Sequence, residues 1–506
     1  MSQNLFTSLS RHFPALAKTC IERPGGGRLT YGDLIAESAQ LAHVLRHKGV
    51  QPGDRVAVQV EKSVEAILLY LATIRLGAIF LPLNTAYTAA ELDYFIGDAE
   101  PVMVVCDPRR AGEIGALTAK HGTKQLETMA ADGSGSLTTS MRQVTAKEFI
   151  DAANGPDDIA AILYTSGTTG RSKGAMLSHD NLFSNAATLK DYWRFSGDDV
   201  LLHALPIFHT HGLFVATNVI LAAGASMIFL PRFDADEIMR LMPRATTLMG
   251  VPTFYVRLLQ HPGLNRQATR HMRLFISGSA PLLSETHHQF QARTGHAILE
   301  RYGMTETNMN TSNPYDGERI AGTVGFPLPG IEIRVTEPET GRLIGRDEIG
   351  MLEIKGPNVF KGYWRNPEKT KAEFRADGFF ITGDLGKIDA RGYVHIIGRG
   401  KDLIISGGYN VYPKEVETEI DLLPGVVESA VIGVPHADFG EAVVAVVVLE
   451  KGAQMSAATV SSALATRLAK YKQPKHIAFL EDLPRNTMGK VQKNILRDSY
   501  KDLFRN

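Results

Sequence analysis

The first two thirds of the chain alternate between two hydrophobic patterns. Leu34 and Leu41 recur at helical spacing, whereas Val56 and Val58 alternate with other residues as they do in a β-strand. The same alternation recurs in AILLYLATIRLGAIFLPL, in LMPRATTLMGVPTFYVRLL and in MRLFISGSAPLLSETHHQFQARTG. Interleaved helices and strands are typical of stacked, mostly parallel sheets covered by helices, so we predict an α/β fold.

The pattern changes after residue 330. The segments IEIRV, GMLEIKG and GYVHIIGRGKDLIISGG are typical of short strands joined by glycine-rich turns. They predict a β-rich subdomain at about residues 330–397, which completes a large N-terminal domain of residues 1–397. A chain of 506 residues is long enough for more than one such core.

A small, mobile α+β domain is expected at residues 403–506. YPKEVETEIDLLPGV predicts a helix with Pro413 in its first turn, VESAVIGVP and EAVVAVVVLE predict strands, and ATRLAKYK predicts another helix. We place the hinge between the two domains at residues 398–402, GRGKD, with Lys401 and Asp402 as its pivot. This segment is polar, carries glycine and separates two strand-like runs.

Composition restricts the possible partners. Lys plus Arg and Asp plus Glu each number 54, which gives no general attraction to nucleic acid or to an anionic membrane. The longest apolar stretch, residues 66–83, is interrupted by Arg75 and Pro82 before it reaches the ~20 residues that span a bilayer. It predicts a buried helix followed by a strand. Cys20 and Cys106 suit neither a disulfide framework nor a metal site, so we expect a reducing compartment, the cytoplasm.

The N-terminus leaves two interpretations open. Its first 21 residues contain Arg11 and Lys18 and no acidic residue, a composition that weakly resembles a mitochondrial transit peptide. The segment leads directly into fold-like sequence, which favours an ordinary N-terminal helix.

The most specific stretch is YTSGTTGRSKG, residues 164–174. A buried strand, residues 159–164, precedes a loop of small and hydroxylated residues that ends at Lys173. Such a loop lets backbone N–H groups and hydroxyls approach phosphate oxygens closely. The GxxxxGK[ST] spacing of a Walker A loop cannot be fitted here. The alternative is a flexible Ser/Gly turn.

Further motifs extend this observation along the chain. They are LPIFHTHG at 205–212, SGSAPL at 277–282, ERYGMTET at 300–307, ITGDLG at 381–386, GRGKD at 398–402, SGGYNVYP at 406–413 and PRNTMGK at 484–490. In this order, together with the phosphate loop, they closely resemble the adenylate-forming superfamily, which includes acyl-CoA synthetases. The resemblance implies a large N-terminal domain with a mobile C-terminal lid.

The resemblance also implies a reaction in two halves, with ATP and Mg²⁺ as cofactors and coenzyme A as co-substrate. A carboxylate attacks the α-phosphorus of ATP and expels pyrophosphate, and a thiol then attacks the acyl-adenylate. By the same resemblance Thr165 and Glu306 hold Mg²⁺, and Lys490 places a positive charge near the reacting oxygens. Lys490 could instead belong to a solvated helical face with Lys493 and Arg497.

The nucleotide is expected to contact residues of several motifs. These are Thr165, Ser166, Gly167, Thr168, Thr169, Gly170, Lys173, Gly278, Ser279, Ala280, Pro281, Glu300, Arg301, Tyr302, Gly303, Met304, Thr305, Asp384, Arg399 and Lys490. Asp384, with Arg399, resembles the residue that binds both ribose hydroxyls, although a turn Asp that caps its own backbone is an alternative. Gly278 to Pro281 and Tyr302 are expected to form the adenine slot.

The second half-reaction requires a path for the thiol. The resemblance places a coenzyme A tunnel at Ser406, Gly407, Gly408 and Tyr409, whose glycines leave room for a narrow pantetheine arm. A tight turn between a strand and a helix would explain the same glycines.

Two histidines, His209 and His211, lie in HTHG. Two positions apart on an extended segment they would point to opposite faces, so we do not expect a metal pair. In the family the first histidine of this motif borders the acyl pocket, and His209 is our choice for that role.

Arg301 in ERYGMTE suggests which acid is activated. A guanidinium keeps its charge, so a buried site for it must supply an anion. Lys490 and Mg²⁺ account for the reacting carboxylate, so Arg301 implies a second carboxylate on the substrate. We expect it to be bound by Arg301 with Ser279, His209 and, more weakly, Arg257, whose simpler interpretation is a surface position on a helix.

The wider pattern ERYGMTETNMNTSNPYDG resembles malonyl-CoA synthetases in particular. The function expected is therefore ATP-dependent formation of malonyl-CoA, with release of AMP and pyrophosphate. The alternatives are a ligase for another short dicarboxylate such as methylmalonate, a ligase for a monocarboxylate in which Arg301 is a structural tie, and a regulatory protein that binds nucleotide without catalysis. Acetylation of Lys490 is a possible form of regulation, because it would abolish the charge.

Overall fold

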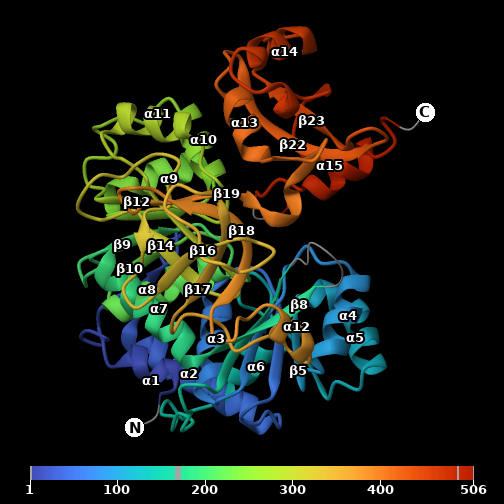
Figure 1. Ribbon diagram of the computed structural model, residues 1–506. Coiled ribbons are helices and arrows are strands. Elements are labelled where there is room, and N and C mark those ends of the chain that lie inside the picture. The colour runs from blue at the N-terminus through green and yellow to red at the C-terminus, as the bar shows by residue number, and fades with distance from the viewer. Residues whose placement is uncertain (1–2, 166–171, 487–488, 505–506) are drawn as a thin grey trace. The chain divides into compact units, whose positions relative to one another are not determined.

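The computed structural model describes residues 3–165, 172–486 and 489–504 (Figure 1). The chain divides into two compact units. Unit 1 comprises Met1–Glu332 with Lys355–Phe380, and unit 2 comprises Ile333–Ile354 with Ile381–Asn506. The β-rich segment predicted at 330–397 therefore contributes mainly to the second unit. The predicted hinge lies inside that unit, and its function stays a prediction.

Within the described residues, unit 1 contains two mostly parallel sheets. The larger has the order β15-β14-β13-β12-β11-β9-β10-β1-β2, with antiparallel neighbours only at its ends. Its strands are β1 (Thr19–Glu22), β2 (Arg28–Thr30), β9 (Val200–His203), β10 (Ser226–Phe229), β11 (Thr247–Gly250), β12 (Leu274–Ser277), β13 (Leu299–Met304), β14 (Asn308–Ser312) and β15 (Phe326–Pro327).

The second sheet has the order β6-β5-β3-β4-β7-β8, and only β8 runs antiparallel to its neighbour. Its strands are β3 (Arg55–Gln59), β4 (Ile79–Pro82), β5 (Met103–Cys106), β6 (Gln125–Thr128), β7 (Ile159–Thr165) and β8 (Lys173–Ser178). Leu92, Phe95 and Ile114 from the helices pack on one of its faces. The strands predicted from Val56 and Val58 and before the phosphate loop are confirmed.

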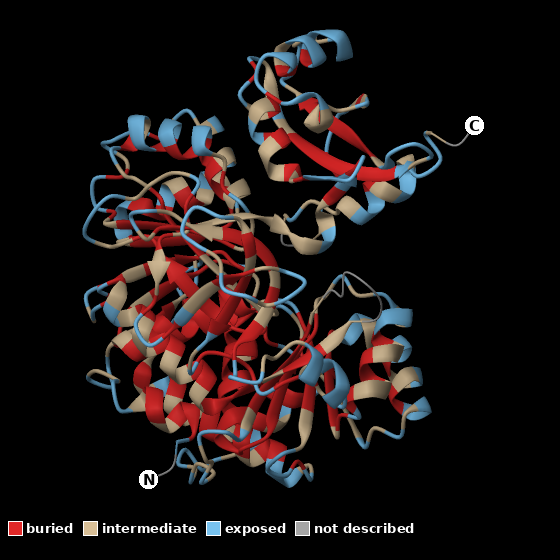
Figure 2. Ribbon diagram, in the orientation of Figure 1, coloured by how far each residue is buried: buried red, intermediate tan, exposed pale blue. Residues whose placement is uncertain are grey.

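Helices cover these sheets, and Figure 2 shows buried residues concentrated along the strands. The helices of unit 1 are α1 (Leu5–Ser10), α2 (Tyr31–His47), α3 (Val64–Arg75), α4 (Ala89–Ala99), α5 (Ala111–Lys120), α6 (Ser136–Gln143), α7 (His179–Tyr192), α8 (Asn218–Ala223), α9 (Ala235–Leu241), α10 (Pro252–Gln260), α11 (Ser284–Thr294) and α12 (Pro367–Ala372), with the short 3₁₀ helices Pro108–Arg110 and Met242–Arg244 and the π-helix η2 (His211–Thr217). The predicted α/β class is confirmed. No helix in the described ranges is long and apolar enough to cross a membrane.

Local sequence explains where several helices begin. Thr30 precedes α2 and forms a capping box with Asp33, and Thr88 precedes α4 and forms one with Glu91. Each box satisfies backbone N–H groups that have no partner within the first helical turn. The helix predicted at the N-terminus is present as α1, with Leu5 buried.

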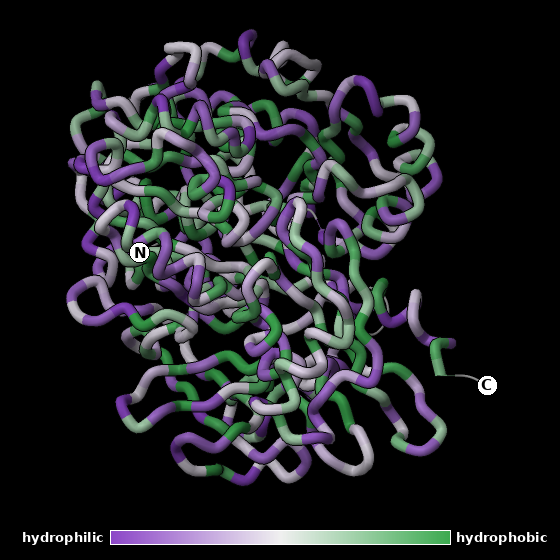
Figure 3. Tube along the Cα trace, turned by 90° about the horizontal axis from the view of Figure 1, so that it is seen from above, coloured by the Kyte–Doolittle hydropathy of each residue, from purple (hydrophilic) through white to green (hydrophobic). Residues whose placement is uncertain are grey.

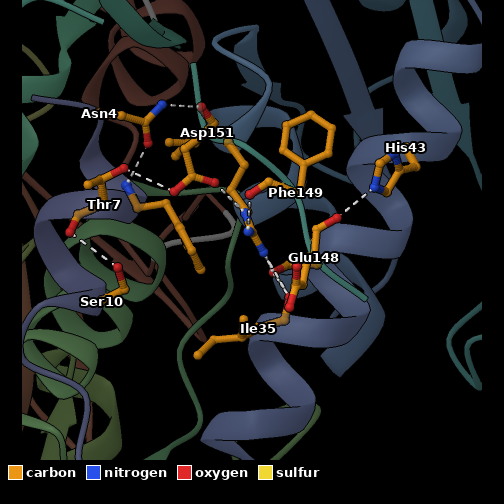
Figure 4. A network of polar contacts seen from close by, with 12 residues as sticks. Asn4, Thr7, Ser10, Ile35, His43, Glu148, Phe149 and Asp151 are labelled. Carbon is orange, nitrogen blue, oxygen red and sulfur yellow. Dashed lines mark hydrogen bonds and ion pairs between the residues drawn. The ribbon is translucent and has the colours of Figure 1, made fainter. Parts of the chain in front are cut away.

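Arg75, the last residue of α3, connects three helices to the segment before β7. Its Nε donates to Asp151 at 2.7 Å, and its Nη1 donates to the carbonyl of Ile35 in α2 at 2.8 Å. Thr7 of α1 donates to the other oxygen of Asp151 at 3.0 Å, as Figure 4 shows. The interrupted apolar stretch 66–83 is thus a buried helix followed by a strand, as predicted, and its one arginine is paired inside the fold.

Unit 2 holds two sheets within the described residues. One has the order β16-β17-β18-β19, and the other has the order β21-β20-β23-β22 with β24 beside β23. The elements are β16 (Glu332–Thr336), β17 (Gly350–Lys355), β18 (Phe380–Ile388), β19 (Val394–Arg399), β20 (Ile404–Ser406), β21 (Tyr409–Val411), β22 (Val426–His436), β23 (Gly440–Leu449), β24 (His476–Leu480), α13 (Pro413–Asp421), α14 (Ala457–Ala465) and α15 (Lys493–Tyr500), with 3₁₀ helices at Gly400–Asp402 and Lys470–Lys472. Strand β23 is apolar and buried along most of its length. Figure 3 shows hydrophobic and hydrophilic segments interspersed along the chain.

The helix predicted from ATRLAKYK is wrong. The helix α14 lies upstream, because the Ser456 side chain caps it by accepting from the Thr459 N–H, and it ends at Ala465. Leu464 and Leu468 both fill the core of this unit, and the chain between them turns out of the helix. The helix predicted to start at Pro413 is confirmed as α13.

Candidate active site

The cation Arg301 lies on β13, directly beside the residue that follows β12. Ser277 and Glu300 are register partners on these parallel strands, which brings Gly278 against the next residue of β13. A Cβ atom on Gly278 would lie 2.4 Å from Cζ of Arg301. A larger residue at position 278 would therefore require the guanidinium or the strand to move.

The Arg301 guanidinium is almost completely buried, with 3% of the residue exposed. Its Nε and Nη2 are buried without a hydrogen-bond partner, and no carboxylate of the described residues forms an ion pair with it. Burial lowers the pKa of Arg301 to about 9, while the nearby Tyr255 opposes this shift. Arg301 is still a cation at neutral pH, and an unpaired buried charge is costly unless a ligand supplies the anion.

His211 is the second polar residue of this site. Its Nδ1 lies 3.2 Å from the Ser279 hydroxyl, and its Nε2 is buried with no hydrogen-bond partner in the described part of the chain. Desolvation, and then the charge of Arg301, lowers the pKa of His211 far below its usual value. The imidazole is therefore neutral at neutral pH. Its Nε2 can form one hydrogen bond with a ligand beside Arg301 without adding charge to the site.

The interpretation of HTHG as an extended segment is wrong, because the chain turns after His209 and enters the π-helix η2 at His211. The structure places His211 beside Ser279 and electrostatically near Arg301, whereas the Nδ1 of His209 accepts from the backbone N–H of His211 at 3.3 Å. Sequence reasoning missed His211. Two histidines in one motif gave no local signal that distinguishes them. No group of three or more metal-ligating side chains is found in the described ranges.

A buried polar chain anchors this π-helix. The Nε2 of His203 lies 2.9 Å from the carbonyl oxygen of Gly212, and Nζ of Lys62 lies 2.9 Å from Nδ1 of the same imidazole. A Cβ on Gly212 would come within 2.0 Å of the Pro206 carbonyl oxygen. These contacts fix the start of η2, and π-helical turns are frequent at functional sites.

The two described ends of the phosphate loop lie side by side. Thr165 ends β7 and Lys173 begins β8, and the two are register partners. Ser166, Gly167, Thr168, Thr169 and Gly170 lie outside the described residues. The Lys173 ammonium lies 4.3 Å from the centre of the Tyr363 ring and 3.2 Å from a carboxylate oxygen of Glu373.

Glu306 lies in the turn between β13 and β14 and is buried, with 6% exposed. The Tyr363 hydroxyl lies 3.0 Å from Oε1 of Glu306 and 2.5 Å from Oε2 of Glu373. Desolvation raises the pKa of Glu373, but hydrogen bonds from Lys369 and Tyr363 outweigh it, so the net shift is downward. Glu373 is thus an anion at neutral pH. Neither Tyr363 nor Glu373 was singled out from the sequence.

Thr165 and Glu306 suit the magnesium ion that the resemblance implies. A hydroxyl and a carboxylate are hard oxygen donors, and Mg²⁺ is commonly held by one or two carboxylates together with substrate phosphates and water. A buried carboxylate whose neighbours include a second anion, Glu373, is a suitable ligand for a divalent cation.

In unit 2, Asp384 and Arg399 are register partners on β18 and β19. The Nε of Arg399 lies 2.8 Å from Oδ1 of the buried Asp384. Lys490 is exposed at the surface, yet desolvation, followed by the charge of Arg399, lowers its pKa to about 8. Asp384 opposes this shift. The predicted ribose residues and Lys490 are therefore electrostatic neighbours.

The remaining predicted residues are placed as follows. Gly407 and Gly408 both have positive φ, at 59° and 80°, and they form the hairpin turn between β20 and β21, while Tyr409 is exposed and stacks on Tyr471. The hairpin requires these glycines whether or not they line a tunnel. Lys401 and Asp402 lie in the 3₁₀ turn between β19 and β20.

Other predicted residues surround Arg301 in unit 1. Arg257 is exposed on α10, while Tyr255 of the same helix is buried and interacts electrostatically with Arg301. Ser279 adopts a left-handed conformation with φ of 71°, which fixes the SGSAPL turn in an uncommon geometry. Glu300 is buried, Ala280 and Tyr302 to Thr305 are half-buried, and Pro281 is exposed.

These features define an acid-activating enzyme that uses a nucleotide. The model of the AMP-binding enzyme family matches residues 10–364, and the model of the AMP-binding enzyme C-terminal domain matches residues 415–490. The chain therefore belongs to the AMP-binding enzyme family, as the motif order predicted.

Particular relatives narrow the comparison. A malonate–CoA ligase of Arabidopsis thaliana is 35% identical over 90% of this chain and 79% of its own length. A long-chain-fatty-acid–CoA ligase of Bacillus subtilis is 34% identical over 98% and 93%. The crystal structure of ATP-bound MatB from Rhodopseudomonas palustris is 65% identical, covers both chains completely and superposes with a TM-score of 0.98. The first two identities differ too little to select the acid, so the pocket must do so.

Proposed function

We propose that this protein is an ATP-dependent malonate–CoA ligase that forms malonyl-CoA through malonyl-adenylate and releases AMP and pyrophosphate. The observation that carries the proposal is the buried Arg301 guanidinium, whose Nε and Nη2 have no hydrogen-bond partner among the residues that the structure describes. A dicarboxylic acid supplies one carboxylate to the reaction and leaves the other for this cation. The similarity to the Arabidopsis malonate–CoA ligase supports the same substrate.

The polar groups near Arg301 are compatible with malonate. Ser279 and the neutral His211 lie next to the guanidinium, so the carboxylate that pairs with Arg301 also meets uncharged hydrogen-bonding groups. A planar guanidinium can bind both oxygens of one carboxylate at once. Arg257 is exposed, so we assign it no direct contact. Methylmalonate, with one additional methyl group, is the alternative substrate.

In the first half-reaction, the free carboxylate of malonate attacks the α-phosphorus of ATP, and the bond to pyrophosphate breaks. The loop from Thr165 to Lys173 holds the outgoing phosphates, and Lys490 neutralises charge on the oxygens between malonate and the α-phosphorus. When bound at Thr165 and Glu306, Mg²⁺ offsets the charge of the phosphates. The Gly278–Pro281 turn with Tyr302 receives adenine, and Asp384 with Arg399 binds the ribose.

In the second half-reaction, the sulfur of coenzyme A attacks the acyl carbon, AMP leaves, and the thiol proton is released to solvent. We propose that Lys401 and Asp402 act as the hinge that removes Lys490, and that Ser406, Gly407, Gly408 and Tyr409 line the path of the pantetheine arm. The hinge is supported by the position of Lys401 and Asp402 in the turn between β19 and β20. The path of the pantetheine arm is supported by the position of the other four residues at the tip of the hairpin of β20 and β21.

Two finer proposals concern the protein in the cell. Acetylation of the exposed Lys490 would remove the charge used in the first half-reaction and so regulate activity. A cytoplasmic location is supported by the two cysteines, Cys20 and Cys106, which are free and buried.

The deciding experiment is Arg301→Ala with malonate and butyrate as paired substrates in ATP–pyrophosphate exchange. Loss of one partner of a buried charge pair costs about 2 to 5 kcal/mol, which corresponds to roughly thirty-fold to several thousand-fold in kcat/KM. We expect malonate activation to fall within this range while butyrate activation is unchanged or improved. An equal loss for both acids would mean that Arg301 is a structural tie. Formation of ADP in place of AMP would exclude an adenylate intermediate.

A further inference from the structure

The Tyr363 hydroxyl occupies an unusual position between two carboxylates. It lies 2.5 Å from Glu373 and 3.0 Å from Glu306, and the residue is buried with 3% exposed. A phenol carries one proton, and an ionised carboxylate can only accept. Tyr363 can therefore donate to only one of the two acids at a time, and both carboxylates lie within reach of its proton, so the hydroxyl is shared between them.

Glu373 is also the link to the phosphate loop. One of its oxygens lies 3.2 Å from the Lys173 ammonium and 2.8 Å from the Lys369 ammonium, and its other oxygen accepts from Tyr363. Lys173 also lies over the face of the Tyr363 ring, at 4.3 Å from its centre. Lys173 and Glu306 are thus joined through two intervening side chains, Glu373 and Tyr363.

The backbone around this chain is fixed. The N–H of Phe360 donates to the carbonyl oxygen of Glu306 at 2.8 Å, and the N–H of Tyr363 donates to the Thr370 hydroxyl at 2.9 Å. Gly362 has a φ of 116°, which only glycine adopts readily, and its carbonyl accepts from Met176 of β8. The tyrosine is therefore held against both β8 and the turn that carries Glu306.

We propose that Tyr363 and Glu373 are positioning residues that hold Glu306 and Lys173 in the arrangement that binds the magnesium complex of ATP. The inference rests on the proposed role of Glu306 as a magnesium ligand. Residues that hydrogen-bond to a metal ligand fix its orientation, and their loss typically lowers metal affinity or activity about 10- to 100-fold. A tyrosine that only filled space would show no such effect when its hydroxyl is removed.

The test is the affinity of the protein–ATP complex for Mn²⁺, a spectroscopic substitute for Mg²⁺ that is measured by electron paramagnetic resonance. We expect Tyr363→Phe to weaken Mn²⁺ binding by about 10- to 100-fold and to leave the KM for malonate unchanged. Tyr31→Phe is the matched control, since Tyr31 is fully buried and its hydroxyl donates to the Ala225 carbonyl at 2.7 Å. The control should bind Mn²⁺ as the parent protein does.

Glu373→Gln gives a second, independent measurement at a less buried position and serves if Tyr363→Phe does not fold. The amide still accepts from Tyr363 but loses the charge that holds Lys173, so Mn²⁺ and ATP should both bind more weakly. Parent-like Mn²⁺ affinity in these variants would overturn the inference. Glu306→Gln distinguishes failure of the proposed metal ligand from failure of the positioning role. If it too binds Mn²⁺ normally, the proposed metal ligand is wrong, and if it alone binds weakly, only the positioning role fails.

Discussion

Gly278 shows how one missing side chain positions a charge. A methyl group there would meet the Arg301 guanidinium at 2.4 Å from Cζ and 2.5 Å from Nη1, so either the strand or the arginine would have to move. Because the guanidinium is buried among packed groups, small displacements alter its fit to a carboxylate.

We therefore predict that Gly278→Ala lowers kcat/KM for malonate by roughly 100-fold, the loss expected for a misplacement of about 1 Å in an oriented site. Gly112→Ala is the control, since Gly112 lies in α5 and a Cβ there meets nothing within 4 Å. Steady-state kinetics on both variants make the comparison. Normal malonate turnover in Gly278→Ala would show that Arg301 tolerates displacement.

Lys490 predicts a pH dependence. Its pKa is lowered from 10.5 to about 8, so its charge is lost as pH rises through about 8. We expect ATP–pyrophosphate exchange to decline above this pH, and Lys490→Arg, which does not titrate there, to lack the decline. Between about 8 and 10.5 the unfolded state binds more protons at this lysine, so its contribution to stability rises with pH. Deprotonation of Lys490 between about pH 8 and 10.5 therefore does not destabilise the fold. A loss of activity that it causes in this range reflects the lost charge and not unfolding.

At the scale of elements, the pair of Arg75 and Asp151 connects α1, α2 and α3 to the segment before β7. Arg75 has 4% of its side chain exposed, and its removal would leave Asp151 without its cation. Breaking such a pair costs about 3 to 5 kcal/mol when both partners are buried, and Asp151 is only partly exposed, at 17%.

We predict that Arg75→Ala destabilises unit 1 by about 3 kcal/mol, measured as a shift in the denaturant midpoint. Arg240→Ala is the matched control, because Arg240 pairs with Glu237 on the surface of α9, where 57% and 29% of the two side chains are exposed. Surface pairs contribute about 0 to 1 kcal/mol, so the control should change little. Equal shifts in the two variants would show that the Arg75 network contributes no more than a surface pair.

At the scale of the whole molecule, the residues assigned to the first half-reaction come from both units. Thr165, Glu306 and Arg301 belong to unit 1, whereas Asp384 and Lys490 belong to unit 2. We propose that Lys490 of unit 2 is needed in the first half-reaction only, and this can be tested by measuring the two half-reactions separately.

Lys490→Ala should nearly abolish adenylate formation, yet leave thioester formation from supplied malonyl-adenylate largely intact. The reason is that, in the proposed mechanism, only the attack on the α-phosphorus brings anions together beside this lysine. Single-turnover assays of the two half-reactions provide the measurement. If both fall by the same factor, Lys490 has a general structural role.

Much of the fold followed from local patterns. Val56 and Val58 identified β3, and Pro413 identified the start of α13, because strand alternation and the restricted φ of proline act over a few residues. The helix assigned to ATRLAKYK failed for the opposite reason. Leu464 and Leu468 are both drawn into the core of unit 2, and that packing decided where the helix ends.

The sequence by itself determined the class of fold, the order of the family motifs and the presence of a cation, Arg301, that requires an anionic partner. Only the tertiary structure decided which groups surround that cation. It put His211 next to Ser279, 68 positions away, and Tyr363 against Glu306, 57 positions away. The sequence specifies the chemical groups of each residue, whereas contacts between distant residues depend on how strands and turns pack together.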